Sequence, residues 1–228
     1  MPIISFANPK GGAGKTTSAL LLANVLASKG AGVTIVDADP EKWISGWANL
    51  SDNIKKIEIR SDVTEDSIVD IIEDAARKTQ FVIVDLEGTA SLMVANAIGM
   101  SDLVLIPTQG ASMDARGAAK TIKLIKNQAR LARREIPHSV VFTRTSAAVA
   151  SRSLKNVRSQ LEDASIPVLK TSIVERAAYR DLLDFGGLLE NLPSKDVSNL
   201  EKAIKNASEF TRDILELLEI SSKKGRAA

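Results

Sequence analysis

The residues with the clearest chemical potential lie near the amino terminus, in the segment Lys10-Gly-Gly-Ala-Gly-Lys-Thr-Thr17. This segment lies between an apolar stretch that predicts a strand and an amphipathic stretch that predicts a helix. Glycines let the backbone turn its N–H groups toward phosphate oxygens, and the positive end of the following helix attracts the same anion. The segment therefore predicts a loop that binds the phosphates of a nucleotide.

Side chains in this loop have separate expected roles. Lys15 would reach the β- and γ-phosphates, and the Thr16 hydroxyl would coordinate Mg²⁺. Thr17 would contact the α-phosphate, while the loop backbone would surround the phosphate oxygens. The residues expected to bind the nucleotide through the loop are Gly11, Gly12, Ala13, Gly14, Lys15, Thr16 and Thr17.

Carboxylates follow two apolar stretches that predict strands. Residues 33–36 lead into Asp37 and Asp39, and residues 81–84 lead into Asp85. Alternate residues of a strand point to the same side, so Asp37 and Asp39 would both face the nucleotide if the extended conformation continued to Asp39. Ligands bind at the carboxyl ends of strands in open α/β sheets, so Asp85 would hold a water molecule bound to Mg²⁺.

Short apolar stretches alternate with longer amphipathic stretches along the whole chain, which predicts an α/β fold. We expect a doubly wound, mostly parallel sheet with helices on both faces, as in P-loop nucleoside triphosphatases. Residues 1–220 would form a single domain, and residues 221–228 a flexible basic tail. Strands are expected at 3–7, 33–36, 57–59, 81–84, 103–106, 140–142 and 167–169, and helices at 15–29, 64–78, 90–99, 114–134, 151–164, 175–185 and 196–219.

The composition excludes several other kinds of site. Of the 228 residues, 44% are hydrophobic and 25% are charged, as is usual for a globular protein. Cysteine is absent, which excludes disulfides, cysteine nucleophiles and thiolate metal sites, and the single histidine, His138, is expected to be structural. The amino terminus lacks the features of a signal peptide, and no apolar run approaches the roughly 20 residues that span a bilayer. We therefore expect a cytoplasmic protein without an integral membrane segment.

The net charge of +2 conceals an uneven distribution, since residues 116–158 carry 11 basic residues and one acidic residue, Glu135. Basic side chains on one stripe can neutralise several phosphates at once, which predicts salt-sensitive DNA binding without sequence readout. A merely solvated helix face is the alternative interpretation. The basic face of the expected helix at 114–134 contains Arg116, Lys120, Lys123, Lys126, Arg130, Arg133 and Arg134, and a second cluster with three-residue spacing contains Arg152, Lys155 and Arg158.

The segment 10–17 matches the pattern Lys-Gly-Gly-x-Gly-Lys-Thr-Thr at every position, and the chain therefore resembles the ParA/MinD ATPases, which have a deviant Walker A motif. The resemblance implies ATP and Mg²⁺ as cofactors and a homodimer in the ATP-bound state. It implies that Lys10 reaches the phosphates of the partner subunit and assists Lys15 in catalysis. It also implies that Asp39 orients or activates the attacking water and that Asp37 supports Mg²⁺ through its water shell.

Other parts of the resemblance are less specific. It places adenine contacts near Thr143 and Arg144, and it places DNA contacts around Arg176 and Arg180. The chain departs from the family after two strand ends, where Glu41 replaces a common glutamine and Asp85-Leu-Glu-Gly88 replaces Asp-x-Pro-Pro. The extra charge of the second departure predicts slow or conditional hydrolysis.

The leading hypothesis is an ATPase similar to the small plasmid-type ParA proteins. It would dimerise on ATP, bind DNA nonspecifically on the nucleoid, and segregate plasmid or chromosomal DNA with a centromere-binding, ParB-like adaptor that stimulates hydrolysis. One alternative is a positioning ATPase of the membrane surface, like MinD, which would need an amphipathic anchor at the carboxyl end. A ParA-like regulator of conjugation or secretion is another, because the cargo is not encoded in the ATPase core.

Overall fold

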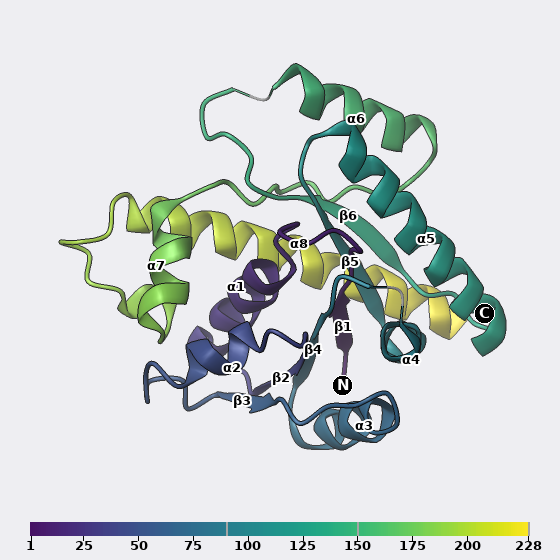
Figure 1. Ribbon diagram of the computed structural model, residues 1–228, viewed down its shortest axis with the longest axis horizontal. Coiled ribbons are helices and arrows are strands. Elements are labelled where there is room, and N and C mark those ends of the chain that lie inside the picture. Colours follow the sequence, from purple (N-terminus) through teal and green to yellow (C-terminus); the bar gives the residue numbers. More distant parts are fainter. Residues whose placement is uncertain (90, 150, 228) are drawn as a thin grey trace.

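In the computed structural model, which describes residues 1–89, 91–149 and 151–227, a sheet of six strands forms the centre of the molecule (Figure 1). Neighbouring strands are parallel throughout the sheet. Their spatial order is β3-β2-β4-β1-β5-β6. The bounds of the strands are β1 (Ile3–Phe6), β2 (Val33–Ala38), β3 (Ile57–Arg60), β4 (Phe81–Leu86), β5 (Leu103–Thr108) and β6 (His138–Phe142).

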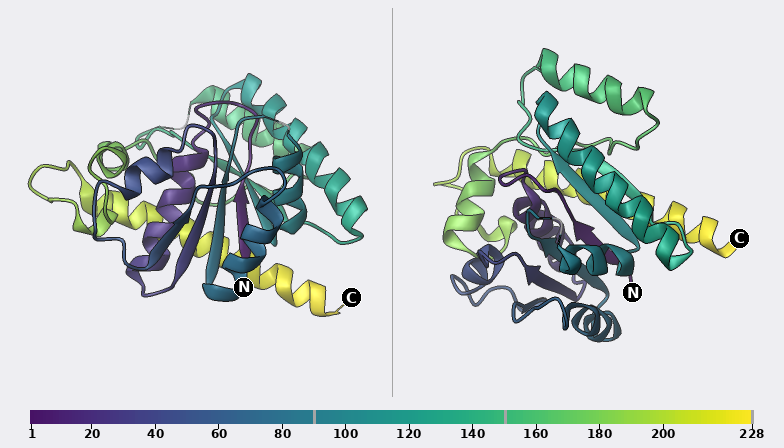
Figure 2. Two further views of the ribbon diagram at one scale, coloured as in Figure 1. Left: turned by 60° about the horizontal axis from the view of Figure 1, so that its bottom comes forward. Right: turned by 45° about the vertical axis from the view of Figure 1, so that its right-hand side comes forward.

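Helices cover both faces of this sheet, and each helical layer encloses its own hydrophobic core (Figure 2). One core is formed with α1 (Lys15–Ser28), α2 (Trp43–Ala48), α7 (Ala177–Phe185), the short 3₁₀ helix η1 (Leu189–Asn191) and α8 (Leu200–Ala227). The other core is formed with α3 (Ile68–Lys78), α4 (Leu92–Met100), α5 (Ser112–Ala132) and α6 (Arg152–Asp163).

The strands are apolar on both sides because each side packs against helices. In β2, Ile35 belongs to the core that contains α1 and α8, whereas Val36 belongs to the opposite core, and both side chains are fully buried. Successive residues of a strand point to opposite faces, so a strand between two helical layers needs an uninterrupted apolar run. The predicted doubly wound sheet is confirmed.

Two elements differ from the expectation. The sequence pattern does not predict the short helix α2. Its six residues include Gly46 and show no helical period of apolar residues. The burial of Ile44 and Trp47 stabilises this helix. The strand expected at 167–169 is wrong, because Val168 makes only an isolated parallel bridge to Val140. Pro167 has no N–H to donate, and the segment contributes only two backbone hydrogen bonds to Val140 before it turns away.

The carboxyl-terminal helix also differs from its expected bounds. It begins at Leu200 and continues to Ala227, through most of the segment that the sequence predicts to be a basic tail. The division into one domain and a tail stays a prediction. Within the described residues, no helix combines the length and the apolar character that a membrane crossing requires.

The apolar side of α8 packs against the body of the protein, where Phe210 and Ile214 are fully buried next to α1. Phe210→Ala should therefore lower the free energy of unfolding by about 3–5 kcal/mol, because it removes a buried ring and leaves a cavity. Urea denaturation followed by circular dichroism measures this. The matched control is Leu131→Ala on α5, which is 76% exposed and should change stability by less than about 0.5 kcal/mol. Equal, small effects of both substitutions would contradict the docking of α8.

Candidate functional site

The loop between β1 and α1 has the backbone geometry of a phosphate-binding loop. Gly12 and Gly14 have positive φ angles of 72° and 95°. A Cβ atom at Gly14 would lie 3.2 Å from the side chain of Thr143, so this position has neither the conformation nor the space for a side chain. The Thr143 hydroxyl donates a hydrogen bond of 2.7 Å to the Ala13 carbonyl, which fixes the loop against the end of β6.

Helix α1 begins at Lys15, and Thr16 in its first turn faces the end of β4. The Thr16 hydroxyl donates a hydrogen bond of 2.7 Å to Oδ2 of Asp85. Asp85 is fully buried, and its Oδ1 has no hydrogen-bond partner among the described residues. Burial raises the pKa of Asp85 to about 7, although the Thr16 hydrogen bond and the Lys15 charge oppose the shift.

A second buried carboxylate lies beside Asp85, because Asp37 on β2 is its register partner across the sheet. Oδ2 of Asp37 accepts hydrogen bonds from the backbone N–H and the hydroxyl of Ser45, at 2.9 and 2.6 Å. Oδ1 of Asp37 has no partner within the described part of the chain. Buried oxygens of this kind need a cation or a donor, so Thr16, Asp37 and Asp85 fit a hydrated divalent metal ion.

Asp39 is placed differently from the expectation. Strand β2 ends at Ala38, so Asp39 lies just beyond the strand, and its charge is, after burial, among the causes that raise the pKa of Asp85. Oδ1 of Asp39 accepts a hydrogen bond of 3.1 Å from the Glu41 N–H, an Asx turn across Pro40. Asp39 is half-buried, and its role stays a prediction.

The segment after β4 lies directly over the phosphate loop. A Cβ atom at Gly88 would be 3.4 Å from the Pro9 carbonyl oxygen and 3.7 Å from Nζ of Lys15. The departure from the family pattern at Glu87 and Gly88 therefore adjoins the expected position of the phosphates. The half-buried Glu87 precedes this contact, and its influence on hydrolysis stays a prediction.

A cavity of about 290 Å³ opens from the phosphate loop toward α7. Thr143 and Arg144 line it, and their contact with the base stays a prediction. Arg176 and Arg180, which the resemblance associated with DNA, line the same cavity, and Nε of Arg176 is buried without a partner in the described residues. The structure therefore groups these two arginines with Thr143 and Arg144 around one cavity, and their contact with DNA stays a prediction. The complete lining is Gly14, Thr17, Ser18, Thr143, Arg144, Ile173, Val174, Glu175, Arg176, Tyr179, Arg180 and Leu183.

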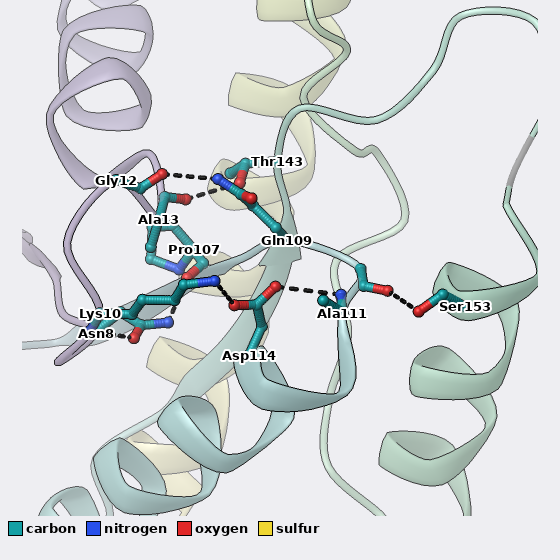
Figure 3. Close-up of polar contacts among 11 residues, drawn as sticks. Asn8, Lys10, Gly12, Ala13, Pro107, Gln109, Ala111, Asp114, Thr143 and Ser153 are labelled. Carbon is teal, nitrogen blue, oxygen red and sulfur yellow. Dashed lines mark hydrogen bonds and ion pairs between the residues drawn. The ribbon is translucent and has the colours of Figure 1, made fainter.

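Lys10 points away from its own phosphate loop and toward the start of α5 (Figure 3). Its ammonium group forms an ion pair with the buried carboxylate of Asp114. Asn8 accepts a hydrogen bond of 2.9 Å from the Lys10 backbone N–H and donates one of 2.6 Å to the Pro107 carbonyl. These contacts connect the phosphate loop to the segment that follows β5.

The connection between β5 and α5 also forms hydrogen bonds with the phosphate loop and with α6 (Figure 3). The side-chain amide of Gln109 donates to the Gly12 carbonyl at 2.8 Å. The Ser153 hydroxyl, in the first turn of α6, donates to the Gly110 carbonyl at 2.6 Å. The same short connection therefore contacts both the phosphate loop and α6.

The expected basic surface occupies the neighbouring helices α5 and α6 (Figures 1 and 2). No carboxylate lies within ion-pair distance of its α5 members in the part of the chain that the structure describes. The exposed basic residues are Arg116, Lys120, Lys123, Lys126 and Arg130 on α5 and Arg152 and Lys155 on α6.

Three other arginines of the predicted basic surface differ from these exposed residues in conformation or in their contacts. Arg133 ends α5 in a left-handed conformation, although it is exposed. Arg134 lies beyond the helix and donates to the carbonyls of Gly99 and Ser101 at 2.6 and 2.9 Å, so it has a structural partner. Arg158 is half-buried, and its guanidinium lies 5.1 Å from the centre of the Phe142 ring.

Sequence reasoning did not identify Asn8, Ser45 or Asp114 as parts of the site. An acid at the third position of a helix is a recognisable capping signal, so Asp114 could have been predicted to cap α5. Its pairing with Lys10 spans 104 residues and could not be inferred from spacing. Ser45 lies on the helix that the sequence pattern did not reveal.

Comparison with known proteins places this arrangement in a family. The model of the VirC1 protein family matches residues 1–220 of the chain. The chain belongs to the VirC1 family. It is 41% identical over 218 residues to Protein ParA of Rhizobium radiobacter. The aligned region covers 96% of this chain and 98% of that protein. This confirms the predicted resemblance to ParA-type ATPases.

One further relative agrees with membership of the VirC1 family, and a solved structure supports the fold. Protein virC1 of Rhizobium radiobacter is 26% identical over 193 residues, covering 82% of this chain and 83% of that protein. A solved structure from Borrelia burgdorferi, described as a plasmid partition protein bound to AMPPNP, superposes with a TM-score of 0.69 at 19% identity. That superposition covers 94% of this chain and 98% of the other, and it supports the fold.

The raised pKa of Asp85 predicts how stability depends on pH. Between the usual aspartate value of 3.8 and about 7, the folded protein binds more protons than the unfolded chain, so stability falls as the pH rises. Asp85→Asn cannot ionise, so its stability relative to wild type should increase by about 2–3 kcal/mol from roughly pH 5 to pH 8 without nucleotide or Mg²⁺. Urea denaturation at both pH values measures this difference.

The control for this prediction is Asp52→Asn, because Asp52 is an exposed aspartate. Its stability should remain parallel to that of the wild type over the same range. A constant difference between Asp85→Asn and wild type would show that the Asp85 carboxyl does not titrate in the folded protein as predicted.

Proposed function

We propose that this VirC1-family protein is a Mg²⁺-dependent ATPase that dimerises when it binds ATP and then binds DNA without sequence preference. A ParB-like adaptor bound to a centromere-like site would stimulate its slow hydrolysis, so that plasmid or chromosomal DNA is segregated on the nucleoid of the cytoplasm. The observation that carries the nucleotide- and metal-binding part of this proposal is the 2.7 Å hydrogen bond between Thr16 and the buried Asp85 beside the phosphate loop.

Different residues of the chain would bind the phosphates, the base and the metal ion. Loop N–H groups and Lys15 would hold the phosphates, and the cavity at Thr143 and Arg144 would receive the base. Thr16 would coordinate the metal directly, while Asp37 and Asp85 would accept hydrogen bonds from its water shell. Bound Mg²⁺ would supply positive charge that stabilises the negative charge on the phosphates in the transition state.

Hydrolysis would need two further residues. Asp39 lies just beyond β2 at a turn, where a small rotation of the side chain could orient the attacking water. Lys10 would leave its own subunit and contact the phosphates bound by the partner, which adds a positive charge only when two loaded subunits meet. Dimerisation and catalysis would thereby be coupled.

The burial of α8 side chains is evidence against the membrane-surface alternative. In the described part of α8, the bulky apolar side chains Phe210 and Ile214 are buried in the protein core rather than available to a bilayer. The basic residues of α5 and α6, by contrast, form an exposed surface suited to a polyanion. We therefore favour DNA as the surface that this protein binds.

The two lysines of the loop should have separable effects. Lys15→Ala should weaken ATP binding by about 100-fold, because a charge-assisted contact to the phosphates is lost. Lys10→Ala should change ATP affinity by less than about threefold yet lower dimer-dependent turnover by at least about 100-fold. Fluorescent ATP titration and turnover at high protein concentration measure the two effects. Lys29→Ala, an exposed lysine at the end of α1, is the control, and normal turnover by Lys10→Ala would refute its role in the partner subunit.

The central test of the proposal is DNA binding by fluorescence anisotropy. A random-sequence duplex should bind tightly with ATP and weakly with ADP or without nucleotide, and salt should weaken the binding. The double variant Lys120→Glu with Lys123→Glu should lower the slope of log affinity against log salt by about 2. Lys55→Glu, an exposed lysine before β3, should leave the slope unchanged. Equal or absent binding in all three nucleotide states would overturn the proposal.

A further inference from the structure

The ion pair between Lys10 and Asp114 joins an accessible cation to an inaccessible anion. The Lys10 side chain is 43% exposed, whereas the Asp114 side chain is 1% exposed. Moving the partly exposed lysine side chain away from the pair costs little free energy, because water can solvate its ammonium group. The buried carboxylate would lose its counter-charge, which costs more free energy. The energetic consequence of separating this pair therefore falls mainly on Asp114.

Asp114 is held firmly in place by the start of α5. Its Oδ2 accepts a hydrogen bond of 3.2 Å from the Ala111 N–H, and its own N–H donates to the Ala111 carbonyl at 2.9 Å. Its Oδ1 contacts Lys10. One carboxylate oxygen thus caps the helix while the other holds the lysine, so the carboxylate cannot follow Lys10 without giving up the cap.

The backbone at Lys10 is anchored to the same region. The Asn8 side chain accepts a hydrogen bond from the Lys10 N–H and donates one to the Pro107 carbonyl. Gly117 on α5 lies next to the Asn8 side chain and leaves just enough room for it. A Cβ atom at Gly117 would lie only 2.9 Å from Oδ1 of Asn8. Backbone and side chain of Lys10 are therefore both directed toward α5 within one subunit.

We propose that Asp114 is a positioning residue that holds Lys10 within its own subunit and thereby raises the ATP concentration needed for dimerisation. The inference rests on the proposed function, in which Lys10 contacts the partner's phosphates. One ammonium group cannot occupy both positions, so each subunit must break its Lys10–Asp114 pair before the dimer closes. The pair acts as a latch that opposes dimerisation at low ATP.

Asp114→Asn tests the latch, because the amide oxygen can still accept the hydrogen bond from Ala111 while the negative charge is removed. Sedimentation velocity at increasing AMPPNP gives the concentration at which half of the protein is dimeric. This concentration should fall by about three- to tenfold in Asp114→Asn, as expected for losing a half-exposed ion pair in each subunit. Glu135→Gln, an exposed acid just beyond α5, is the matched control and should not change it.

A second measurement reports on the contact itself. Acetylation of the nucleotide-free protein, followed by mass spectrometry, gives the rate at which Lys10 reacts relative to the exposed Lys29. The relative rate for Lys10 should rise by at least about threefold in Asp114→Asn, because the ammonium group is no longer held in an ion pair. If Asp114→Asn does not fold, Asp114→Gln serves both measurements, since glutamine at the third helical position can also accept a hydrogen bond from the N–H of the N-cap residue.

The outcomes separate this inference from the proposed function. Wild-type protein that dimerises with AMPPNP, together with an unchanged midpoint or an unchanged Lys10 rate in Asp114→Asn, overturns the latch and leaves the proposed function intact. Wild-type protein that stays monomeric at saturating AMPPNP contradicts the proposed function. In that case a dimeric Asp114→Asn supports the latch, and a monomeric Asp114→Asn overturns it.

Discussion

The chemistry of this protein depends on the burial of its sheet on both faces. Strands β2 and β4 are covered by helices on either side, so the carboxylates at their ends have almost no contact with water. Asp37 and Asp85 each keep one oxygen without a partner in the described residues, and charges in such surroundings are costly unless a cation or donor compensates them. Polar groups therefore collect at the carboxyl edge of the sheet, where a nucleotide and its metal ion can satisfy them.

The elements that the sequence predicted well are those whose signals are local. An apolar run bounded by charges is sufficient to predict a buried strand, and a glycine-rich loop between a strand and a helix is sufficient to predict phosphate binding. Asp85 and Thr16 follow from these two patterns, and the structure brings them within hydrogen-bond distance. The match to the VirC1 family agrees with the predicted resemblance to ParA-type ATPases.

The features that the sequence could not predict depend on contacts between distant residues. Helix α2 is stabilised by Trp47 packing into the core, which no helical period reveals. The grouping of Arg176 with Thr143 around one cavity depends on how α7 packs beside the phosphate loop. The segment 167–169 has strand-like composition, but Pro167 and the short run limit it to a single bridge. Composition and period carry no information about such placements.

The short connection between β5 and α5 limits how this protein can vary. Gly110 lies against Leu154 of α6, whose side-chain atoms would be 2.8 Å from a Cβ atom there, while Gln109 contacts the phosphate loop. A larger residue at position 110 would move α6 away from the sheet. The lysines and arginines that are exposed on both helices are not subject to this limit, since their side chains lie in solvent. Charge on these two helices can therefore change without moving them, whereas the spacing between the phosphate loop and α6 is fixed by the close contact at Gly110.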